Sequence, residues 1–388
     1  MKKILSLVFL SGWSMAMAVD EPVKDKKATR RARKAAKIEK KEPVEVPIKP
    51  MSEIRNAPRV EPDIRLRLNR DAVKAAAAEV DRLVAPVQAK AGVKPNPRAK
   101  DSTFVRRVYL DLTGRIPSAR EALLFLRDTR PDKRERLIDA LLVSPGYRSH
   151  QFNWMADMFR VKSGIKRWNY ANYQRWLKDQ IEANRPWSEV VYDLMTAEGS
   201  LATSGPSGYL LRDPGMPLDN LSNTLSVFLG ANVACAQCHD HPLAEWTQRE
   251  FYEMASFFGG TYVSALDPRK VGKRLMNKQI SKQEIMSVVA PNMAQVRNLG
   301  EQRLTYPDDY AYDDVKPGAP VEPVLIAWHA DDRKLDIYDL KSADAVRLRE
   351  QFAAWLTAPE NPRFAISVAN RLWQRAFGIA VQEPIENL

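Results

Sequence analysis

The sequence predicts a mainly α-helical protein with a small irregular or β-containing segment. Of its 388 residues, 45% are hydrophobic and 28% are charged, as in an ordinary globular protein. Apolar residues recur at helical spacing over most of residues 63–263 and again over 341–388. Residues 264–340, which lie between them, are rich in proline and polar side chains, so we expect a connector of loops and short strands there.

The chain opens with the pattern of a secretory signal peptide over residues 1–18. Two lysines precede an apolar run from Ile4 to Met17, and the small residues Ala16 and Ala18 stand at the expected cleavage site. The run is too short to span a bilayer well. We therefore expect a periplasmic or secreted protein with no transmembrane span after signal cleavage.

Most of the net positive charge lies in a basic, proline-containing linker over residues 19–62. The chain has 60 Lys and Arg against 48 Asp and Glu, a net charge of +12, and residues 24–41 alone contribute +8. Such like-charge runs stay solvated and extended, so we expect this linker to be disordered. It offers a contact for an anionic membrane or wall surface. Export excludes nucleic acid as the partner.

Helix signals follow one another within residues 63–263. Apolar residues at helical spacing predict helices over residues 71–89, 102–112, 134–143 and 218–229. Capping boxes that mark further helix starts are formed by Ser118 with Glu121 and by Thr247 with Glu250. The helix over residues 134–143 is expected to stop at Ser144-Pro145-Gly146, because proline and glycine interrupt helices.

Residues 151–199 are dense in aromatic side chains, whose spacing favours a helix–helix core over a sugar-binding surface. The prolines and glycines of residues 203–220 predict a loop. Helical patterns return over residues 342–356 and 361–377 in the last part of the chain.

The cysteines mark the most informative stretch. Both cysteines and two of the four histidines fall within residues 235–241, Cys-Ala-Gln-Cys-His-Asp-His. Cys-x-x-Cys-His is the spacing of c-type haem attachment, in which two thiols reach the vinyl groups of one porphyrin edge and the next imidazole reaches the iron. The pattern predicts that Cys235 and Cys238 bind haem c, with His239 as the iron ligand.

Two other chemistries fit the same residues. In an oxidising compartment Cys235 and Cys238 can close a structural or redox-active disulfide. Alternatively Cys235, Cys238 and either His241 or His239 are zinc ligands, completed by a remote residue. If haem is bound, the candidates for its sixth ligand are Met216, Met293, His150 and His329, whereas Met254 has the spacing of a core residue.

Other candidate sites carry weaker signals. Residues 308–314 hold four carboxylates, and Asp331 and Asp332 follow further along the chain. Calcium prefers oxygen ligands such as these. A solvated acidic loop is nevertheless favoured, because the carboxylates are not spaced as in a calcium-binding loop. For Asn370 and Arg371 we expect a role in polar packing between helices. The sequence has no P-loop, nucleophile elbow or dinucleotide fingerprint, so no catalytic residue is assigned and the question of an enzyme stays open.

Four stretches resemble a large family of exported bacterial proteins, best known from planctomycetes, whose domain has no known function. They are the signature Val-Arg-Arg-Val-Tyr-Leu-Asp-Leu-Thr-Gly-Arg-Ile-Pro at 105–117, the Cys-x-x-Cys-His-x-His-Pro motif with Trp-Thr-Gln within 228–248, a connector at 312–323, and the start of a companion domain at 356–378. The resemblance covers residues 75–263 and 345–388. Family members often carry a separate planctomycete-type cytochrome c domain, so the resemblance implies a redox setting. It also implies that residues 341–388 are a truncated start of the companion domain.

The leading hypothesis is therefore an exported c-type haem-binding protein of the cell envelope that transfers electrons to a redox partner or another envelope protein. The alternative is a non-haem envelope binding or scaffold protein, in which the cluster at residues 235–241 is a zinc site or a disulfide.

Overall fold

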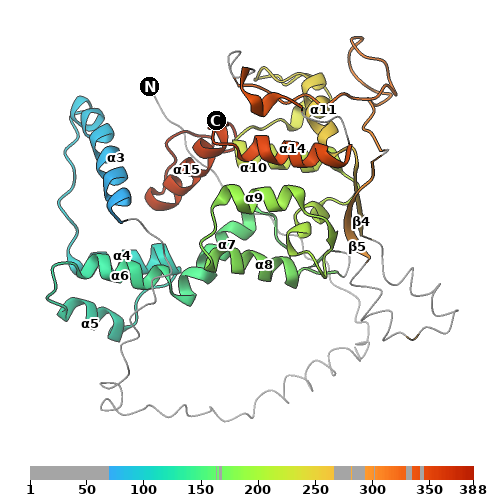
Figure 1. The fold of residues 1–388 in the computed structure, drawn as a ribbon. Coiled ribbons are helices and arrows are strands. Elements are labelled where there is room, and N and C mark those ends of the chain that lie inside the picture. The colour runs from blue at the N-terminus through green and yellow to red at the C-terminus, as the bar shows by residue number, and fades with distance from the viewer. Residues whose placement is uncertain are drawn as a thin grey trace, which may run out of the picture. The chain divides into compact units, whose positions relative to one another are not determined.

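The computed structural model describes residues 70–162, 164–165, 168–265, 281, 293–300, 302–328, 334–340 and 345–388 (Figure 1). The chain divides into two compact units, Met1–Glu61 and Pro62–Leu388, and the elements below belong to the second. The signal peptide and basic linker predicted for residues 1–62 lie outside the described residues, as do His329, Asp331 and Asp332.

The described chain is mainly helical, as predicted. Its α-helices are α3 (Arg70–Lys90), α4 (Asp101–Thr113), α5 (Ala119–Arg127), α6 (Lys133–Leu142), α7 (Pro145–Met158), α8 (Ala171–Glu182), α9 (Trp187–Thr196), α10 (Pro217–Leu229), α11 (Gln248–Ala255), α14 (Ala345–Thr357) and α15 (Pro362–Phe377). Its short 3-10 helices are η1 (Gly205–Gly208), η2 (Leu210–Arg212), η3 (Ala234–Gln237), η4 (Ser256–Phe258) and η8 (Asp336–Tyr338). Its strands are β1 (Gly164–Ile165), β2 (Trp168–Asn169), β3 (Gly199–Ser200), β4 (Thr261–Ala265) and β5 (Ala294–Asn298).

The predicted helix starts are confirmed, and one predicted stop has a second role. Ser118 Oγ accepts the backbone N–H of Glu121 at 3.3 Å, and Thr247 Oγ1 accepts that of Glu250 at 3.1 Å, so both capping boxes form. Ser144 follows the end of α6 but also caps α7, because its Oγ accepts the N–H of Tyr147 at 3.1 Å. Proline is well suited to the first position of a helix, where its missing N–H is not needed. The same three residues therefore end one helix and begin the next.

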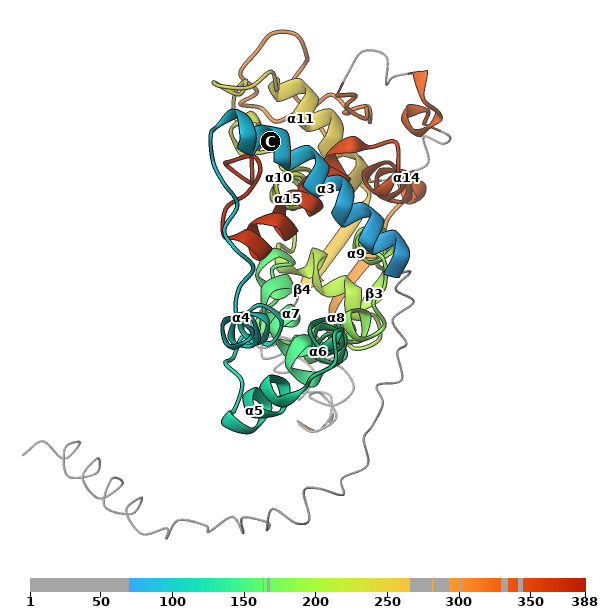
Figure 2. The ribbon, with the colours of Figure 1, turned by 90° about the vertical axis from the view of Figure 1, so that its left-hand side faces the viewer.

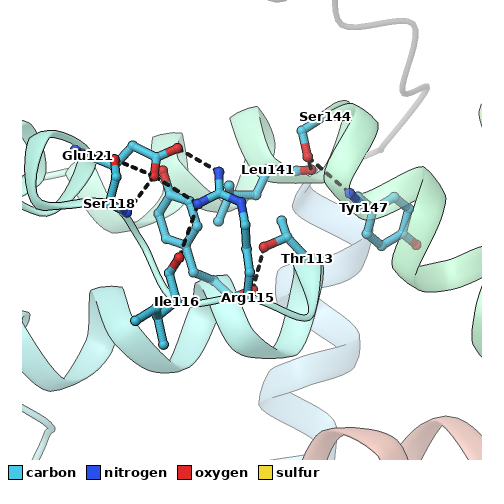
Figure 3. A network of polar contacts seen from close by, with 9 residues as sticks. Thr113, Arg115, Ile116, Ser118, Glu121, Leu141, Ser144 and Tyr147 are labelled. Carbon is cyan, nitrogen blue, oxygen red and sulfur yellow. Dashed lines mark hydrogen bonds and ion pairs between the residues drawn. The ribbon is translucent and has the colours of Figure 1, made fainter. Parts of the chain in front are cut away.

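The turn between α4 and α5 is held by a polar network (Figure 3). Arg115 donates to the Glu121 carboxylate from both terminal nitrogens, at 2.9 Å from Nη1 and 2.7 Å from Nη2. Glu121 also accepts the backbone N–H of Ser118 at 2.7 Å. α4, α5 and α6 share a small core made of Val105, Val108, Tyr109, Phe125 and Leu141. The turn thus joins the first two helices of this small core.

A larger core is formed by residues of α7, α8, α9, α10 and α11 together with residues of α14 and β5. The aromatic stretch supplies much of it: Phe159 and Tyr173 are fully buried, and the Phe159 ring centroid lies 5.5 Å from that of Phe228 on α10. On the other side, Phe258 meets Phe352 of α14 at 5.0 Å between centroids. The predicted core role of the aromatic stretch is therefore confirmed for its buried members.

A small antiparallel sheet accompanies these helices, in the order β3-β5-β4. β5 is central, with Val296 opposite Val263 of β4 and Gly199 of β3. β1 and β2 pair in a separate two-stranded ribbon. A single bridge between Thr305 and Pro320 closes the loop that follows β5. In the part of the chain described here, no helix has the length and apolarity needed to cross a bilayer.

Candidate functional site

The cysteine motif follows directly on α10, which ends at Gly230. Gly230 has φ 57°, and its N–H reaches back to the carbonyl of Leu225, a left-handed helix end that glycine adopts without steric cost. A Cβ at this position would lie 2.6 Å from Leu388 Cγ. The carbonyl of Gly230 also accepts the N–H of Leu388 at 2.7 Å. Leu388 therefore packs on Gly230, the residue that leads into the cysteine motif.

The motif itself is a tight turn that directs both thiols outward. η3 covers Ala234–Gln237, and Cys238 N–H donates to the carbonyl of Cys235 at 3.2 Å. Ala236, between the two cysteines, is fully buried. Cys235 and Cys238 are both exposed, and both are free thiols. The turn is anchored by its middle and presents its two sulfur atoms to solvent.

The two histidines of the motif differ in their hydrogen bonds. His239 Nδ1 lies 2.7 Å from the carbonyl oxygen of Asp240. Because a carbonyl only accepts, Nδ1 is the donor in this contact, which leaves Nε2 as the ring nitrogen that can ligate a metal. His241 Nδ1 instead accepts the N–H of Leu243 at 3.1 Å, so its lone pair is already used. His239 is thus prepared to ligate a metal through Nε2, and His241 is not.

One glutamine fastens the loop that carries these residues. Gln248, the first residue of α11, is 1% exposed. Its backbone N–H donates to the Asp240 carboxylate at 2.8 Å, and its Nε2 donates to the carbonyl of Gln237 at 3.2 Å. Its Oε1 accepts the N–H of Ala311 at 3.0 Å. Gln248 therefore joins the motif, α11 and the loop after β5 in one set of hydrogen bonds.

A group of tyrosines borders the site on the side of that loop. The Tyr312 hydroxyl accepts the N–H of Asp240 at 2.9 Å. The Tyr310 ring centroid lies 6.1 Å from that of Tyr312 and 6.2 Å from that of Tyr252. Burial raises the pKa of Tyr252, and the nearby Asp309 and Cys238 raise it further. The Tyr252 phenol is therefore protonated and neutral at ordinary pH.

The last helix packs against the end of α10 (Figures 1 and 2). Arg371 of α15 donates to the carbonyls of Val227 and Ser226, both at 3.1 Å. These are carbonyls of the last turn of α10, whose acceptors have no partner within the helix. Asn370 Oδ1 accepts the N–H of Val381 at 2.8 Å. Polar packing by Asn370 and Arg371 is confirmed, and it holds the helix that leads to the motif.

The other predicted metal ligands lie elsewhere in the fold. Met216 stands at the start of α10, Met293 is buried in the large core, and His150 lies on α7 near Gly114. Met254 is fully buried, as its spacing predicted. Among the residues that the structure describes, no three His, Cys, Asp or Glu side chains are placed to hold a metal ion. In the acidic run, Asp314 lies 3.7 Å from Arg249 in an ion pair.

Two family models match the chain, one over residues 79–262 and one over residues 348–388. Residues 79–262 match the family model PSCyt2, described as a protein of unknown function (DUF1549). Residues 348–388 match a second family model, PSD1, described as a protein of unknown function (DUF1553). No curated protein and no solved structure matches the chain significantly.

The DUF1549 match runs from α3 to β4 and includes the whole cysteine motif. The DUF1553 match begins within α14 and includes α15, so Arg371 joins the two matched regions through its contact with α10. Gln248 and Tyr312 were not identified from the sequence as parts of the site. Gln248 belongs to the Trp-Thr-Gln stretch of the resemblance and Tyr312 opens its connector stretch, and these were the available signals.

Proposed function

We propose that this chain is an exported c-type haem-binding protein of the cell envelope that exchanges electrons with a redox partner or another envelope protein. Cys235 and Cys238 would hold the haem through thioether bonds, with His239 Nε2 as the iron ligand. The observation that carries the proposal is the difference between the two histidines: the Nδ1 of His239 faces a carbonyl acceptor, which leaves its Nε2 lone pair for a metal, whereas the Nδ1 lone pair of His241 already accepts the N–H of Leu243.

The chemistry of the donor set fits this group. Two exposed free thiols are separated by one turn, and an exposed imidazole follows at once. Leu243, two residues after His241, is 91% exposed, and Tyr312 is 40% exposed. These side chains offer apolar surface for a macrocycle to cover, which would remove the Leu243 side chain from water.

The protein's own residues would orient the ligand. The Asp240 carbonyl fixes the tautomer and the direction of the His239 ring, as carbonyl partners of metal-bound imidazoles do. Gln248 holds the Asp240 carboxylate through its backbone N–H, and the Tyr312 hydroxyl holds the Asp240 backbone N–H. When bound, haem supplies reversible one-electron transfer. The rigid backbone would keep the ligand in place during that change of charge.

The zinc alternative is less well supported. With His241 as the third ligand beside Cys235 and Cys238, the Nδ1 lone pair of His241 is already occupied by the N–H of Leu243. Zinc also requires four converging ligands in a structural site, and the described residues hold no group of three candidate ligands.

The test is to express the chain, with its N-terminal segment, in a bacterium that carries a haem-attachment system. The matched variant is Cys235→Ser/Cys238→Ser, which preserves size and exposure. We expect a covalent haem band and a pyridine haemochrome spectrum from the natural sequence and neither from the variant. Purified protein with two titratable thiols or stoichiometric zinc, and no covalent haem, would contradict the proposal.

Export is tested with the same material. We expect the natural sequence to be recovered from the periplasm or medium without residues 1–18. Deletion of residues 1–18 should retain the protein in the cytoplasm and abolish haem attachment, because attachment takes place on the exported side. Covalent haem on the deleted form would separate attachment from export and contradict this part of the proposal.

A further inference from the structure

We propose that a second site, separate from the cysteine motif, binds a small oxyanion carried by a carboxylate or phosphate group. It consists of Arg160, Tyr170, Arg212, Asp213 and Asn220, which we call the Arg212 cluster. It lies where α10 begins, and the motif follows where α10 ends. The 13 residues of α10 put about 20 Å of helix between the two sites.

The charges of the Arg212 cluster do not cancel. Arg160 Nη1 pairs with Asp213 Oδ2, and Arg212 Nη1 lies 3.4 Å from Asp213 Oδ1. Two guanidinium groups thus share one carboxylate, which leaves a net charge of +1. The Asp213 side chain is 9% exposed, so water does little to screen it. Arg160 also has a φ of 57°, a backbone conformation that costs energy for a residue other than glycine and that often occurs at functional sites.

Several polar atoms of the Arg212 cluster are buried with no hydrogen-bond partner. They are the Tyr170 hydroxyl, Arg212 Nε and Asn220 Oδ1. Tyr170 is 1% exposed and Asn220 is 3% exposed. Each buried polar group without a partner costs about 1–3 kcal/mol, so three in one cluster are a strong indication that something else binds there.

The Tyr170 hydroxyl faces the charged members of the cluster and is available as a donor. Burial raises its pKa, and Arg212, Asp213 and Arg160 are the charged groups that act on it. The phenol therefore stays protonated. An oxyanion can accept hydrogen bonds from the Tyr170 hydroxyl and Arg212 Nε together, while a protonated or hydroxyl oxygen of the same ligand can donate to Asn220 Oδ1.

The start of α10 adds to the attraction for an anion. Met216 occupies the N-cap position and supplies no side-chain hydrogen bond, and Pro217 follows it. The N-cap side chain therefore leaves the first N–H groups of α10 unbonded, and the acidic residue of the first turn is Asp219. The Arg212 side chain is 27% exposed and Met216 is 49% exposed, so the cluster borders solvent on this side, from which a small ligand would enter.

The test compares thermal unfolding of the full chain in sodium phosphate, sodium acetate and sodium chloride at equal ionic strength, with dissociation constants from calorimetry. We expect phosphate or acetate to raise the melting temperature above its value in chloride, and the better of the two identifies the class of oxyanion. Tyr170→Phe removes one oxygen. Because that oxygen has no partner, the variant should be as stable as the natural protein in chloride but should bind the anion at least about tenfold more weakly.

Tyr173→Phe is the matched control, because Tyr173 is equally buried in the first turn of α8, which Tyr170 directly precedes, but its hydroxyl donates to the carbonyl of Phe159 at 2.9 Å. It should lower the melting temperature in chloride and keep the response to the anion. The proposal is wrong if neither anion stabilises the natural protein beyond chloride, or if Tyr170→Phe responds as the natural protein does. A loss of stability by Tyr170→Phe in chloride would equally overturn it.

Discussion

The turn at residues 113–121 and the cysteine motif at residues 235–241 are both distinctive in sequence, yet they use their polar side chains in opposite ways. In the first, Arg115, Ser118 and Glu121 form hydrogen bonds with one another (Figure 3). In the second, the loop is fastened by several hydrogen bonds, but among the described residues neither the two thiols nor His239 Nε2 has a partner.

The difference separates a structural signature from a functional one. A group of polar residues whose bonds are all internal needs no ligand to explain it. Exposed nucleophilic and ligating atoms on a rigid backbone have no stabilising role of their own, so their presence together requires another explanation. The comparison predicts that substitutions in the turn change stability, and that substitutions of the exposed motif side chains do not.

The largest expected loss of stability is at the junction between α10 and the motif. Gly230→Ala places a Cβ 2.6 Å from Leu388 Cγ at a φ of 57°, so we expect a loss of about 2–4 kcal/mol from strain and overpacking. Urea unfolding measures it. Gly92→Ala is the matched control, because Gly92 also has positive φ but no atom within 4 Å of its Cβ, and it should cost about 1 kcal/mol. Equal losses would contradict the packing of Leu388 on Gly230.

The next effect concerns the residue that fastens the motif. Gln248→Ala removes the closer donor to the Gln237 carbonyl and the acceptor of the Ala311 N–H, and we expect a loss of about 2–3 kcal/mol in urea unfolding. Gln248→Glu keeps an acceptor for Ala311 but loses the donor to Gln237 and buries a carboxylate at a position that is 1% exposed, so its loss should be at least as large. If both variants match the natural protein in stability, Gln248 does not hold the motif in place.

A smaller and pH-dependent effect is expected in the turn. The Arg115 guanidinium, with further help from Ser118, lowers the pKa of Glu121 from 4.5 to about 2. A carboxyl whose pKa is lower in the folded state stabilises the fold above its unfolded pKa, and that contribution is lost as the pH falls from about 4.5 to about 2. Arg115→Gln should therefore cost about 1 kcal/mol at pH 7 and almost nothing near pH 2.

Thermal unfolding across that pH range checks the turn. Arg136→Gln serves as the control, since Arg136 forms an exposed pair with Asp132 four residues away, which contributes no more than about 0.5 kcal/mol. A loss for Arg115→Gln that is the same at pH 7 and pH 2 would show that the Glu121 carboxylate is not involved.

Local features of the fold were predictable from the sequence. Both capping boxes formed, and α10 and α15 lie within a residue or so of the helices that spacing predicted. Such signals depend on residues three or four apart, which the sequence displays directly. Ser144 was the exception, because a cap and a proline look alike whether they end a helix or begin one.

The arrangement around the site was not predictable in the same way. Gln248 meets Ala311 across 63 residues of chain, and Arg371 meets Ser226 across 145. The periodicity of apolar residues in a sequence carries no information on contacts between residues so far apart in the chain. The identity of the motif residues was visible in the sequence, but the different tautomers of His239 and His241 depend on backbone atoms that only the folded turn brings to each ring. The Arg212 cluster was hidden for the same reason.

The most direct measurement of the central claim compares His239→Ala with His241→Ala after expression with a haem-attachment system. We predict that His241→Ala keeps the absorption spectrum of the natural protein, whereas His239→Ala loses the axial nitrogen and shifts the Soret and α bands or fails to retain haem. Urea unfolding of the haem-free forms should show little difference between them, because neither ring is buried. Identical spectra from the two variants, or an altered spectrum only in His241→Ala, would contradict the account.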